Sequence, residues 1–173
     1  MSKRPPRTLS SGANNTVLAL SNTEVGKLFF GDTRSDIGSE AEKMKCANDI
    51  NDLVVKFVHL DIFENNSEML VMERLYPFDF RAFEQERRLL WLDVFEDELA
   101  QLHRAGFVPR DLQRPSNLPS MTYDNIFLTE TGIRLIDVGI SALGHQVGGK
   151  LFDRFVKLEL EGFEKFRTFF LDR

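Results

Sequence analysis

Two carboxylates and one amide stand at the ends of short apolar runs in the second half of the chain. They are Asp111, Asn125 and Asp137. Residues 126–128 and 133–136 form two brief, mainly apolar segments, and residues 129–132 between them, Thr-Glu-Thr-Gly, predict a hairpin with a glycine-containing turn. Pairing of the two strands would bring Asn125 and Asp137 to neighbouring strand ends. We therefore expect a rigid scaffold to aim these oxygen-bearing side chains at one point.

The order of short motifs around these residues resembles a known family. V-P-R-D-L, then D-N-I-F-L, then R-L-I-D-V-G are similar to the catalytic loop, hairpin and metal-binding turn of the protein-kinase-like superfamily. The resemblance implies that Asp111 orients the attacking hydroxyl or accepts its proton. It also implies that Asn125 and Asp137 hold magnesium on the phosphates of ATP. Each motif alone is weak, but their order and the hairpin between them make the resemblance fairly specific.

Two features depart from the pattern of that family. Pro109 replaces the usual histidine, so the hydrogen bond that this histidine gives to the metal-binding turn cannot form. Asp111 and Asn125 are fourteen residues apart, which places an insertion rich in Pro, Ser and Asn within residues 113–124. Asn117 is the rival metal ligand, and Asn125 is preferred because it directly precedes a hairpin strand. The ordinary alternative is that the two aspartates are acids of a loop and a turn.

The composition is that of an ordinary globular protein. The chain has 173 residues, 42% of them hydrophobic and 28% charged, which predicts one domain or one small bilobal unit. A net charge of -5 gives no reason to expect a nucleic-acid partner. One cysteine, Cys46, excludes an internal disulfide, and with three scattered histidines a zinc site is not expected. Because no apolar run could cross a bilayer, we expect no membrane association and a cytoplasmic location.

Residues 9–20, L-S-S-G-A-N-N-T-V-L-A-L, resemble the glycine-rich loop of kinases between two antiparallel strands. Only the middle of three glycine positions is kept, as Gly12, while Ser10 and Asn15 occupy the outer two. Small side chains let backbone amides approach a phosphate, and asparagine enters positive φ more readily than most residues. The resemblance implies that Val17 lies over the adenine ring. By itself, the segment would be a plain hairpin turn.

Lys27 lies within a predicted apolar strand, residues 24–30, and such a lysine needs a partner because an unpaired buried ammonium is costly. The resemblance implies that Lys27 contacts the α and β phosphates and pairs with a helix glutamate. Residues 36–50 predict that helix, and helical spacing places Glu40 beside its apolar face, whereas Glu42 points away. Glu40 is therefore the predicted partner. The alternative is an edge-strand lysine that reaches solvent.

Residues 53–62 and 69–75 predict two further strands, which would complete a five-stranded antiparallel sheet with one helix. The sequence E-M-L-V-M-E-R-L-Y-P resembles the last strand of the small lobe of a kinase as it enters the hinge. The resemblance implies that Met72 is the gatekeeper and that the backbone of Glu73 and Leu75 hydrogen-bonds the adenine edge.

Two helices are expected in the remainder of the chain. Residues 83–104 carry an apolar stripe at helical spacing and end at Gly106, with His103 near that end as a partner for the helix dipole. Residues 151–171 predict one long helix with phenylalanines on one side, whose rings we expect to pack in the core. No A-P-E motif follows the metal-binding turn, which favours a minimal large lobe without the usual peptide-docking helices.

The sequence therefore predicts an α+β protein with a kinase-like bilobal fold. Residues 1–7 would be a disordered tail, residues 8–76 the small lobe and residues 77–173 the reduced large lobe, within a single kinase-like domain at 8–173. The expected function is transfer of the γ-phosphoryl group of ATP, with Mg²⁺, to a hydroxyl of a protein Ser or Thr or of a small molecule. One alternative is an inactive pseudokinase that binds nucleotide or acts as a scaffold. Another is an interaction module that uses the Phe-rich C-terminal helix.

Overall fold

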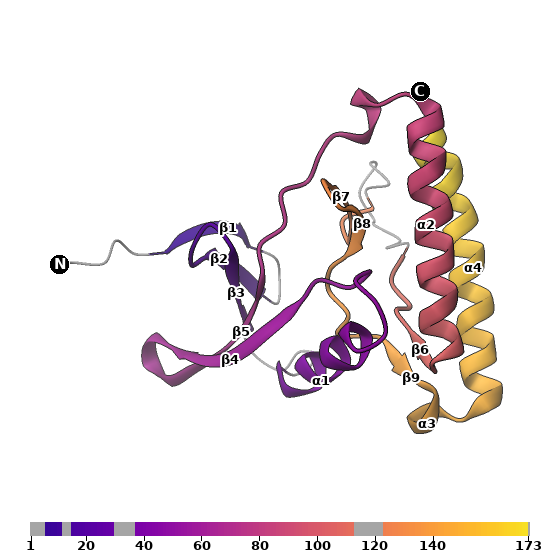
Figure 1. Ribbon diagram of the computed structural model, residues 1–173. Coiled ribbons are helices and arrows are strands. Elements are labelled where there is room, and N and C mark those ends of the chain that lie inside the picture. Colours follow the sequence, from indigo (N-terminus) through magenta and orange to yellow (C-terminus); the bar gives the residue numbers. More distant parts are fainter. Residues whose placement is uncertain (1–5, 12–14, 30–36, 113–122, 173) are drawn as a thin grey trace.

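The computed structural model describes residues 6–11, 15–29, 37–112 and 123–172 of the chain. The fold is α+β, as the sequence predicts. A five-stranded antiparallel sheet with one helix occupies one side of the molecule, and two long helices lie side by side on the other (Figure 1). A small hairpin lies between these two parts.

The sheet has strand order β1-β2-β3-β5-β4, and every neighbouring pair is antiparallel. Its strands are β1 (Arg7–Ser11), β2 (Asn15–Ala19), β3 (Glu24–Phe29), β4 (Phe57–Phe63) and β5 (Ser67–Glu73). The predicted five-stranded sheet is confirmed. β1 starts at Arg7, inside the segment predicted as a tail, whereas residues 1–5 lie outside the described residues. A 3₁₀ turn, η1 (Glu64–Asn66), joins the last two strands.

The prediction of a strand from residue 53 is wrong at its start, because β4 begins only at Phe57. Leu53, Val54 and Val55 are fully buried, but they pair with Leu135 of the hairpin and not with the sheet. The Val55 amide donates to the Leu135 carbonyl at 2.8 Å, and the Leu135 amide donates to the Leu53 carbonyl at 2.7 Å. An apolar run shows that a segment is buried, but it does not identify the strand that it pairs with.

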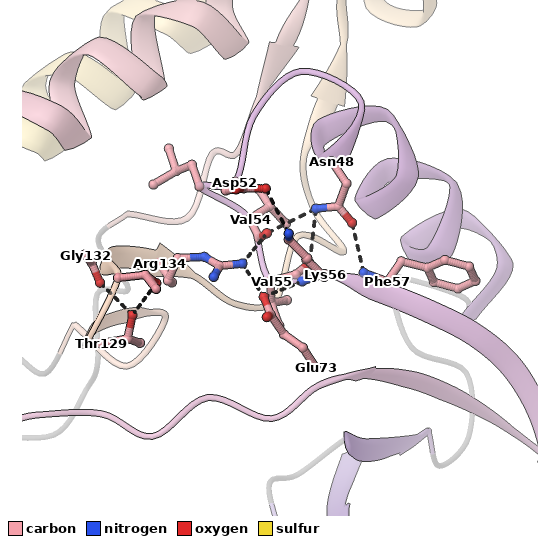
Figure 2. Close-up of polar contacts among 12 residues, drawn as sticks. Asn48, Asp52, Val54, Val55, Lys56, Phe57, Glu73, Thr129, Gly132 and Arg134 are labelled. Carbon is pink, nitrogen blue, oxygen red and sulfur yellow. Dashed lines mark hydrogen bonds and ion pairs between the residues drawn. The ribbon is translucent and has the colours of Figure 1, made fainter. Parts of the chain in front are cut away.

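Helix α1 (Ile37–Asn48) packs against β4 and β5 through a row of small and flexible apolar side chains. Its fully buried members are Ala41, Met44 and Ala47. The last residue of the helix, Asn48, is tied to the following chain (Figure 2). The Asn48 Nδ2 atom donates to the carbonyls of Val54 and Val55, and the Phe57 amide donates to Asn48 Oδ1 at 2.9 Å. These bonds fix the segment that connects α1 with β4.

The long helices form the opposite side of the molecule. They are α2 (Gln85–Arg104) and α4 (Gly149–Leu171), and each follows a short element: the 3₁₀ turn η2 (Phe80–Ala82) and the helix α3 (Gly144–Val147), respectively. The helix predicted from residue 83 begins two residues later, at Gln85. The predicted core role of the phenylalanines of α4 is confirmed for Phe163 and Phe166, which meet Phe95 of α2 edge-on at 5.4 and 5.7 Å. Such ring pairs are favourable beyond their buried area.

Two short strand pairs connect the sheet with the helices. The predicted hairpin is β7 (Ile126–Thr129) with β8 (Gly132–Leu135), and β6 (Phe107–Val108) pairs with β9 (Ala142–Leu143). The connection from β5 to α2 touches the hairpin, because the Phe78 amide donates to the Leu128 carbonyl at 2.8 Å. The hairpin is therefore bonded to the sheet side through the segment before β4 and to the linker through β7.

The apolar core extends through both parts of the molecule. One cluster joins side chains of α1, the sheet, the hairpin and the long helices, including Met44, Leu70, Phe95, Leu135 and Phe163. A smaller cluster, Leu18, Leu28, Met69 and Val71, covers the other face of the sheet. Within the described residues, no helix is long and apolar enough to cross a membrane.

Candidate functional site

Lys27 and Glu40 form a buried ion pair between β3 and α1, so the glutamate selected by helical spacing is the partner of the lysine. The Lys27 Nζ atom lies 2.9 Å from Glu40 Oε1 and 3.0 Å from Oε2, and the two side chains are 4% and 1% exposed. Burial raises the pKa of the Glu40 carboxyl, and this outweighs the opposite effect of the Lys27 ammonium. The lysine therefore does not reach solvent from an edge strand, and the predicted alternative of an exposed lysine is excluded.

Asp137 approaches the same ammonium from the end of the hairpin. Its Oδ1 atom lies 3.1 Å from Lys27 Nζ, and its side chain is 26% exposed. The next turn is also tied to α1, because Lys43 Nζ donates to the Gly139 carbonyl. The turn that carries Asp137 is thus held in two places, by Lys27 of β3 and by Lys43 of α1. The charged groups of the site are therefore the Lys27 ammonium and the Glu40 and Asp137 carboxylates that contact it.

The sheet places further predicted residues on the face that carries Lys27. Val17 is opposite Lys27 in the β2–β3 register, Ser10 is opposite Val17, and Leu70 is opposite Lys27 from β5. Directly opposed residues of antiparallel strands share a face, and so do residues two apart on one strand. Met72, two residues after Leu70, is therefore on this face as well. Gly12 lies outside the described residues.

Asp111 and Asn125 meet although fourteen residues separate them. Asn125 Nδ2 donates to Asp111 Oδ2 at 2.9 Å. The Ile136 amide donates to the Asn125 carbonyl at 2.9 Å, which sets Asn125 beside the residue before Asp137, as the predicted hairpin requires. The rival ligand Asn117 lies outside the described residues.

Two residues of the site have unusual backbone conformations. Arg110 has φ of 72° and Asp137 has φ of 59°, both in the left-handed region, which costs a non-glycine residue about 1–3 kcal/mol. Among the described non-glycine residues, only Asn66 in the turn between β4 and β5 shares this conformation. Strain of this kind persists where surrounding contacts enforce it. Arg110 precedes the predicted catalytic Asp111, and Asp137 is a predicted metal ligand.

A buried glutamate of α4 supports the turn at Arg110. Glu159 Oε1 accepts the Arg110 backbone amide, and Glu159 Oε2 lies 2.7 Å from His103 Nε2 of α2. The preceding carbonyl, that of Pro109, accepts from Ser141 Oγ at 3.1 Å. The turn at Pro109 and Arg110 is thus held by α2, α4 and the segment after Asp137. His103, expected as a dipole partner only, belongs to this network.

Replacement of Glu159 by glutamine is expected to change how stability depends on pH. Burial raises the pKa of the Glu159 carboxyl above its ordinary value of 4.5, so the folded state holds this proton more tightly than the unfolded state. The contribution of Glu159 to the free energy of unfolding is therefore greatest at low pH. It is lost as the pH rises above about 4.5 and through the pKa of the folded state. Glutamine retains an acceptor for the Arg110 amide but has no proton to lose.

The measurement is urea unfolding of wild type and Glu159→Gln between pH 5 and pH 8, with Glu161→Gln, an exposed neighbour, as the control. The free energy of unfolding of Glu159→Gln minus that of wild type should increase with pH. The same difference for Glu161→Gln should stay flat. A Glu159→Gln difference that is constant or decreases with pH would contradict the assignment.

Three of the residues predicted to border adenine, Met72, Glu73 and Leu75, lie at the end of β5 or just after it. The Glu73 amide donates to the Lys56 carbonyl at 2.9 Å, so only the carbonyl of Glu73 could serve as an adenine contact. Leu75 follows the strand and packs partly buried against the main core together with Val17. The predicted strand end at residue 75 is wrong, because β5 ends at Glu73. Asn15 begins β2 opposite Phe29.

Three contributors were missed in the sequence. Glu159 lies on the apolar stripe of α4, four residues after Phe155 and four before Phe163, and a charged residue on such a stripe is a detectable signal. Arg134 stands inside a short apolar strand, as Lys27 does, and is also buried. Lys43 gives no such signal, because a helix lysine normally faces solvent.

No protein-family description and no curated protein sequence matches the chain. The site must therefore be interpreted from its own geometry. Within the described residues, no group of three or more His, Cys, Asp and Glu side chains could hold a metal ion alone. Magnesium usually takes one or two protein carboxylates and completes its shell with waters and phosphate oxygens. Asp137 and the Oδ1 atom of Asn125 fit that incomplete donor set.

Proposed function

We propose that the chain is a kinase-like phosphotransferase that uses ATP and Mg²⁺ to phosphorylate a hydroxyl group. The observation that carries the proposal is the buried Lys27 ammonium between Glu40 on one side and Asp137 on the other. A lysine held in this way is aimed at the place where a carboxylate now lies, and a phosphate oxygen is a comparable anionic partner. The Asp111–Asn125 pair supplies the second half of such a site.

Each described residue has a role that its contacts support. Glu40 holds Lys27 in one orientation, so that its ammonium can bind the α and β phosphates. Asp111 accepts a hydrogen bond from Asn125 through Oδ2, and its carboxylate can orient an acceptor hydroxyl or take its proton. Val17, Met72 and the carbonyl of Glu73 would border the adenine. Positioning and charge neutralisation supply the rate enhancement in this type of reaction.

Asp137 and Asn125 would hold the magnesium ion. When bound, the ion would neutralise negative charge on the phosphates of ATP. Asp137 now faces Lys27, so nucleotide binding would exchange this ion pair for two new ones: Lys27 with phosphate and Asp137 with the metal. Because Asn125 uses its amide nitrogen toward Asp111, its oxygen is the atom left for a metal.

The proposal includes a bilobal organisation of the kinase type. The sheet with α1 would be the small lobe, and the hairpin with the long helices would be a reduced large lobe. Lys27 and Glu40 come from the first part, whereas Asp111, Asn125 and Asp137 come from the second. A nucleotide bound between Lys27 and Asp137 would therefore contact both parts.

The test begins with thermal unfolding in the presence of ATP, with and without magnesium. A ligand that binds only the folded state raises Tm, and we expect the largest rise when ATP and magnesium are both present. A titration with ADP and a non-hydrolysable ATP analogue would identify the role of the γ-phosphate. Absence of any Tm change at millimolar Mg-ATP would reject the proposal.

Binding without turnover is the second candidate, and the observation that favours it is Pro109 at the position of the usual histidine. Transfer of labelled γ-phosphate to the chain itself or to a generic acceptor separates the two functions. An enzyme should lose this transfer in Asp111→Asn while the Mg-ATP Tm rise persists. Equal transfer by wild type and Asp111→Asn, at or near background, would support a nucleotide-binding protein without turnover.

A further inference from the structure

Arg134 of β8 contacts the end of the sheet at a point away from Lys27. Its Nη2 atom donates to the Val54 carbonyl at 3.2 Å and pairs with Glu73 Oε1 (Figure 2). Glu73 Oε1 also accepts the Lys56 backbone amide at 2.8 Å. The Arg134 side chain is 8% exposed and that of Glu73 is 26% exposed. This Glu73–Arg134 pair therefore joins the last residue of β5 to the strand that leads to Asp137.

The pair closes a ring of contacts around the proposed nucleotide site. Lys27 lies on β3, and β3 is bonded to β5 through a register that sets Glu24 opposite Glu73. Glu73 contacts Arg134, which stands three residues before Asp137 on the same strand and turn. Asp137 returns to Lys27 at 3.1 Å. Within the described residues, two ion pairs thus connect the sheet with the hairpin and the turn after it. One is Glu73–Arg134 and the other is Lys27–Asp137.

The two ion pairs differ in what nucleotide binding would do to them. Under the proposed function, Lys27 turns to phosphate and Asp137 to the metal, so their direct contact is lost when the site is loaded. The Glu73–Arg134 pair has no part in those contacts and can persist. It would then keep the strand that leads to Asp137 attached to the sheet, alongside the hydrogen bond from Lys43 of α1 to the Gly139 carbonyl.

A gain in stability does not account for this pair. Desolvation of a buried ion pair commonly cancels its attraction, and an apolar pair of similar volume is often equally stable. What the ion pair adds is direction, because the Nη2 atom of Arg134 donates to both the Glu73 carboxylate and the Val54 carbonyl. A pair that fixes direction at little net gain in stability is suited to positioning.

We propose that Arg134 and Glu73 are positioning residues that hold the Asp137 strand in register with the nucleotide-binding face of the sheet during phosphoryl transfer. This inference rests on the proposed function. Arg134 acts through Leu135 and Ile136, whose amides donate to Leu53 and Asn125, and it touches neither substrate nor metal. A misplacement of about 1 Å in a reacting geometry can slow a reaction about a hundredfold.

The experiment compares Arg134→Met, Glu73→Met and the double variant Glu73→Met/Arg134→Met with wild type. Each single variant leaves one charge without its partner and should lower both Tm and kcat. The double variant removes both charges, so its Tm should return toward that of wild type. Its kcat should remain about tenfold to a hundredfold lower, with a smaller change in KM for ATP, because apolar side chains impose no direction.

A matched control is available in the same region. Lys56 and Asp52 form an ion pair at 3.2 Å that is 52% and 70% exposed and is also visible in Figure 2. Lys56→Met should leave kcat and KM within about twofold of wild type, since exposed pairs contribute little. The Lys56 backbone amide, which bonds Glu73, is retained in that variant.

Hydrogen exchange provides a readout that needs no nucleotide. The amides of Leu135 and Ile136 should exchange faster in the double variant than in wild type, although both have similar Tm. Amides of α2 should exchange equally in the two proteins. This comparison measures whether the pair holds β8, whatever the function of the site.

Three results would overturn the inference. The first is recovery of kcat together with Tm in the double variant, which would give the pair a role in folding alone. The second is a wild-type kcat in the single variants, and the third is unchanged exchange at Leu135 and Ile136. If wild type itself neither binds Mg-ATP nor transfers phosphate, the proposed function fails, and the positioning role in transfer fails with it. That result is distinguishable, because it is seen before any variant is made.

Discussion

Replacement of Asp137 by alanine is expected to lower phosphoryl transfer from ATP about a thousandfold, because several kcal/mol of charge stabilisation would be lost at the phosphates. The magnesium-dependent part of the ATP-induced Tm rise should disappear. The part that depends on ATP alone should remain, since Lys27 keeps its bond to Glu40. In the absence of Asp137, the Lys27 ammonium has one carboxylate fewer to release when it binds a phosphate of ATP.

Asp137 has positive φ, so alanine at this position introduces strain as well as removing a ligand. Asp137→Asn separates these effects, because asparagine tolerates the left-handed region but carries no charge. Both variants should lose transfer, and Asp137→Asn should unfold closer to wild type. Asp124→Ala removes an exposed acid beside Asn125 and should transfer phosphate within about twofold of wild type. Transfer at wild-type rate by both Asp137 variants would refute the assigned role.

Replacement of Lys27 by methionine is expected to have the largest effect on stability. Removal of one member of a buried ion pair costs about 3–5 kcal/mol, because the remaining charge is left without a partner. Glu40 is 1% exposed and would then face Asp137 with no cation between them. We expect transfer and ATP binding to be lost as well, because no ammonium would remain at this position for the phosphates.

The loss of stability in Lys27→Met should increase with pH. Burial already raises the pKa of Glu40, and without Lys27 the pKa rises further. The folded variant therefore binds a proton that the unfolded chain has released above its ordinary pKa of 4.5, so its stability decreases as pH rises through the folded-state value. The deficit relative to wild type should be larger at pH 8 than at pH 5, as measured by urea unfolding.

Two variants complete the comparison. Lys27→Met/Glu40→Leu should recover most of the stability, because the uncompensated carboxylate is gone, yet it should not recover transfer. Lys45→Met changes an exposed lysine of α1 that lies 4.6 Å from the Phe57 ring and should cost no more than about 1 kcal/mol. If Lys27→Met is as stable as Lys45→Met at pH 8, Glu40 is not an ion-paired buried carboxylate in solution.

Local patterns predicted the parts of the site that lie on one element or on neighbouring elements. Helical spacing selected Glu40 over Glu42, and the structure pairs Glu40 with Lys27. The apolar runs around the Thr-Glu-Thr-Gly turn predicted the hairpin, and its register set Asn125 beside Ile136 and thus beside Asp137. In each case, the period of the element fixes which side chains share a face, so a short stretch of sequence is sufficient.

The same patterns failed where a segment had to choose between partners. Residues 53–55 are as apolar as a sheet strand, but they pair with Leu135 of the hairpin instead of extending β4. Burial in the core satisfies the hydrophobic requirement in either arrangement, so apolar content cannot distinguish them. The backbone hydrogen bonds to Leu135 decide which strand this segment pairs with. That strand is about eighty residues away along the chain, and Arg134 and Val54, which also bond here, are 80 residues apart.

The sequence by itself determined the α+β class and the five-stranded sheet, and together with the family resemblance it selected Glu40 as the partner of Lys27. Only the tertiary structure decided that Glu159 holds the Arg110 turn and that Arg134 joins β8 to Glu73. Their partners lie 49 and 61 residues away. Periodicity reports which face of an element is buried, whereas the identity of the opposing face depends on how all elements pack together. For this reason, Glu159 and Arg134 leave a signal in the sequence, a charge within an apolar stripe or strand, but the sequence does not identify their partners.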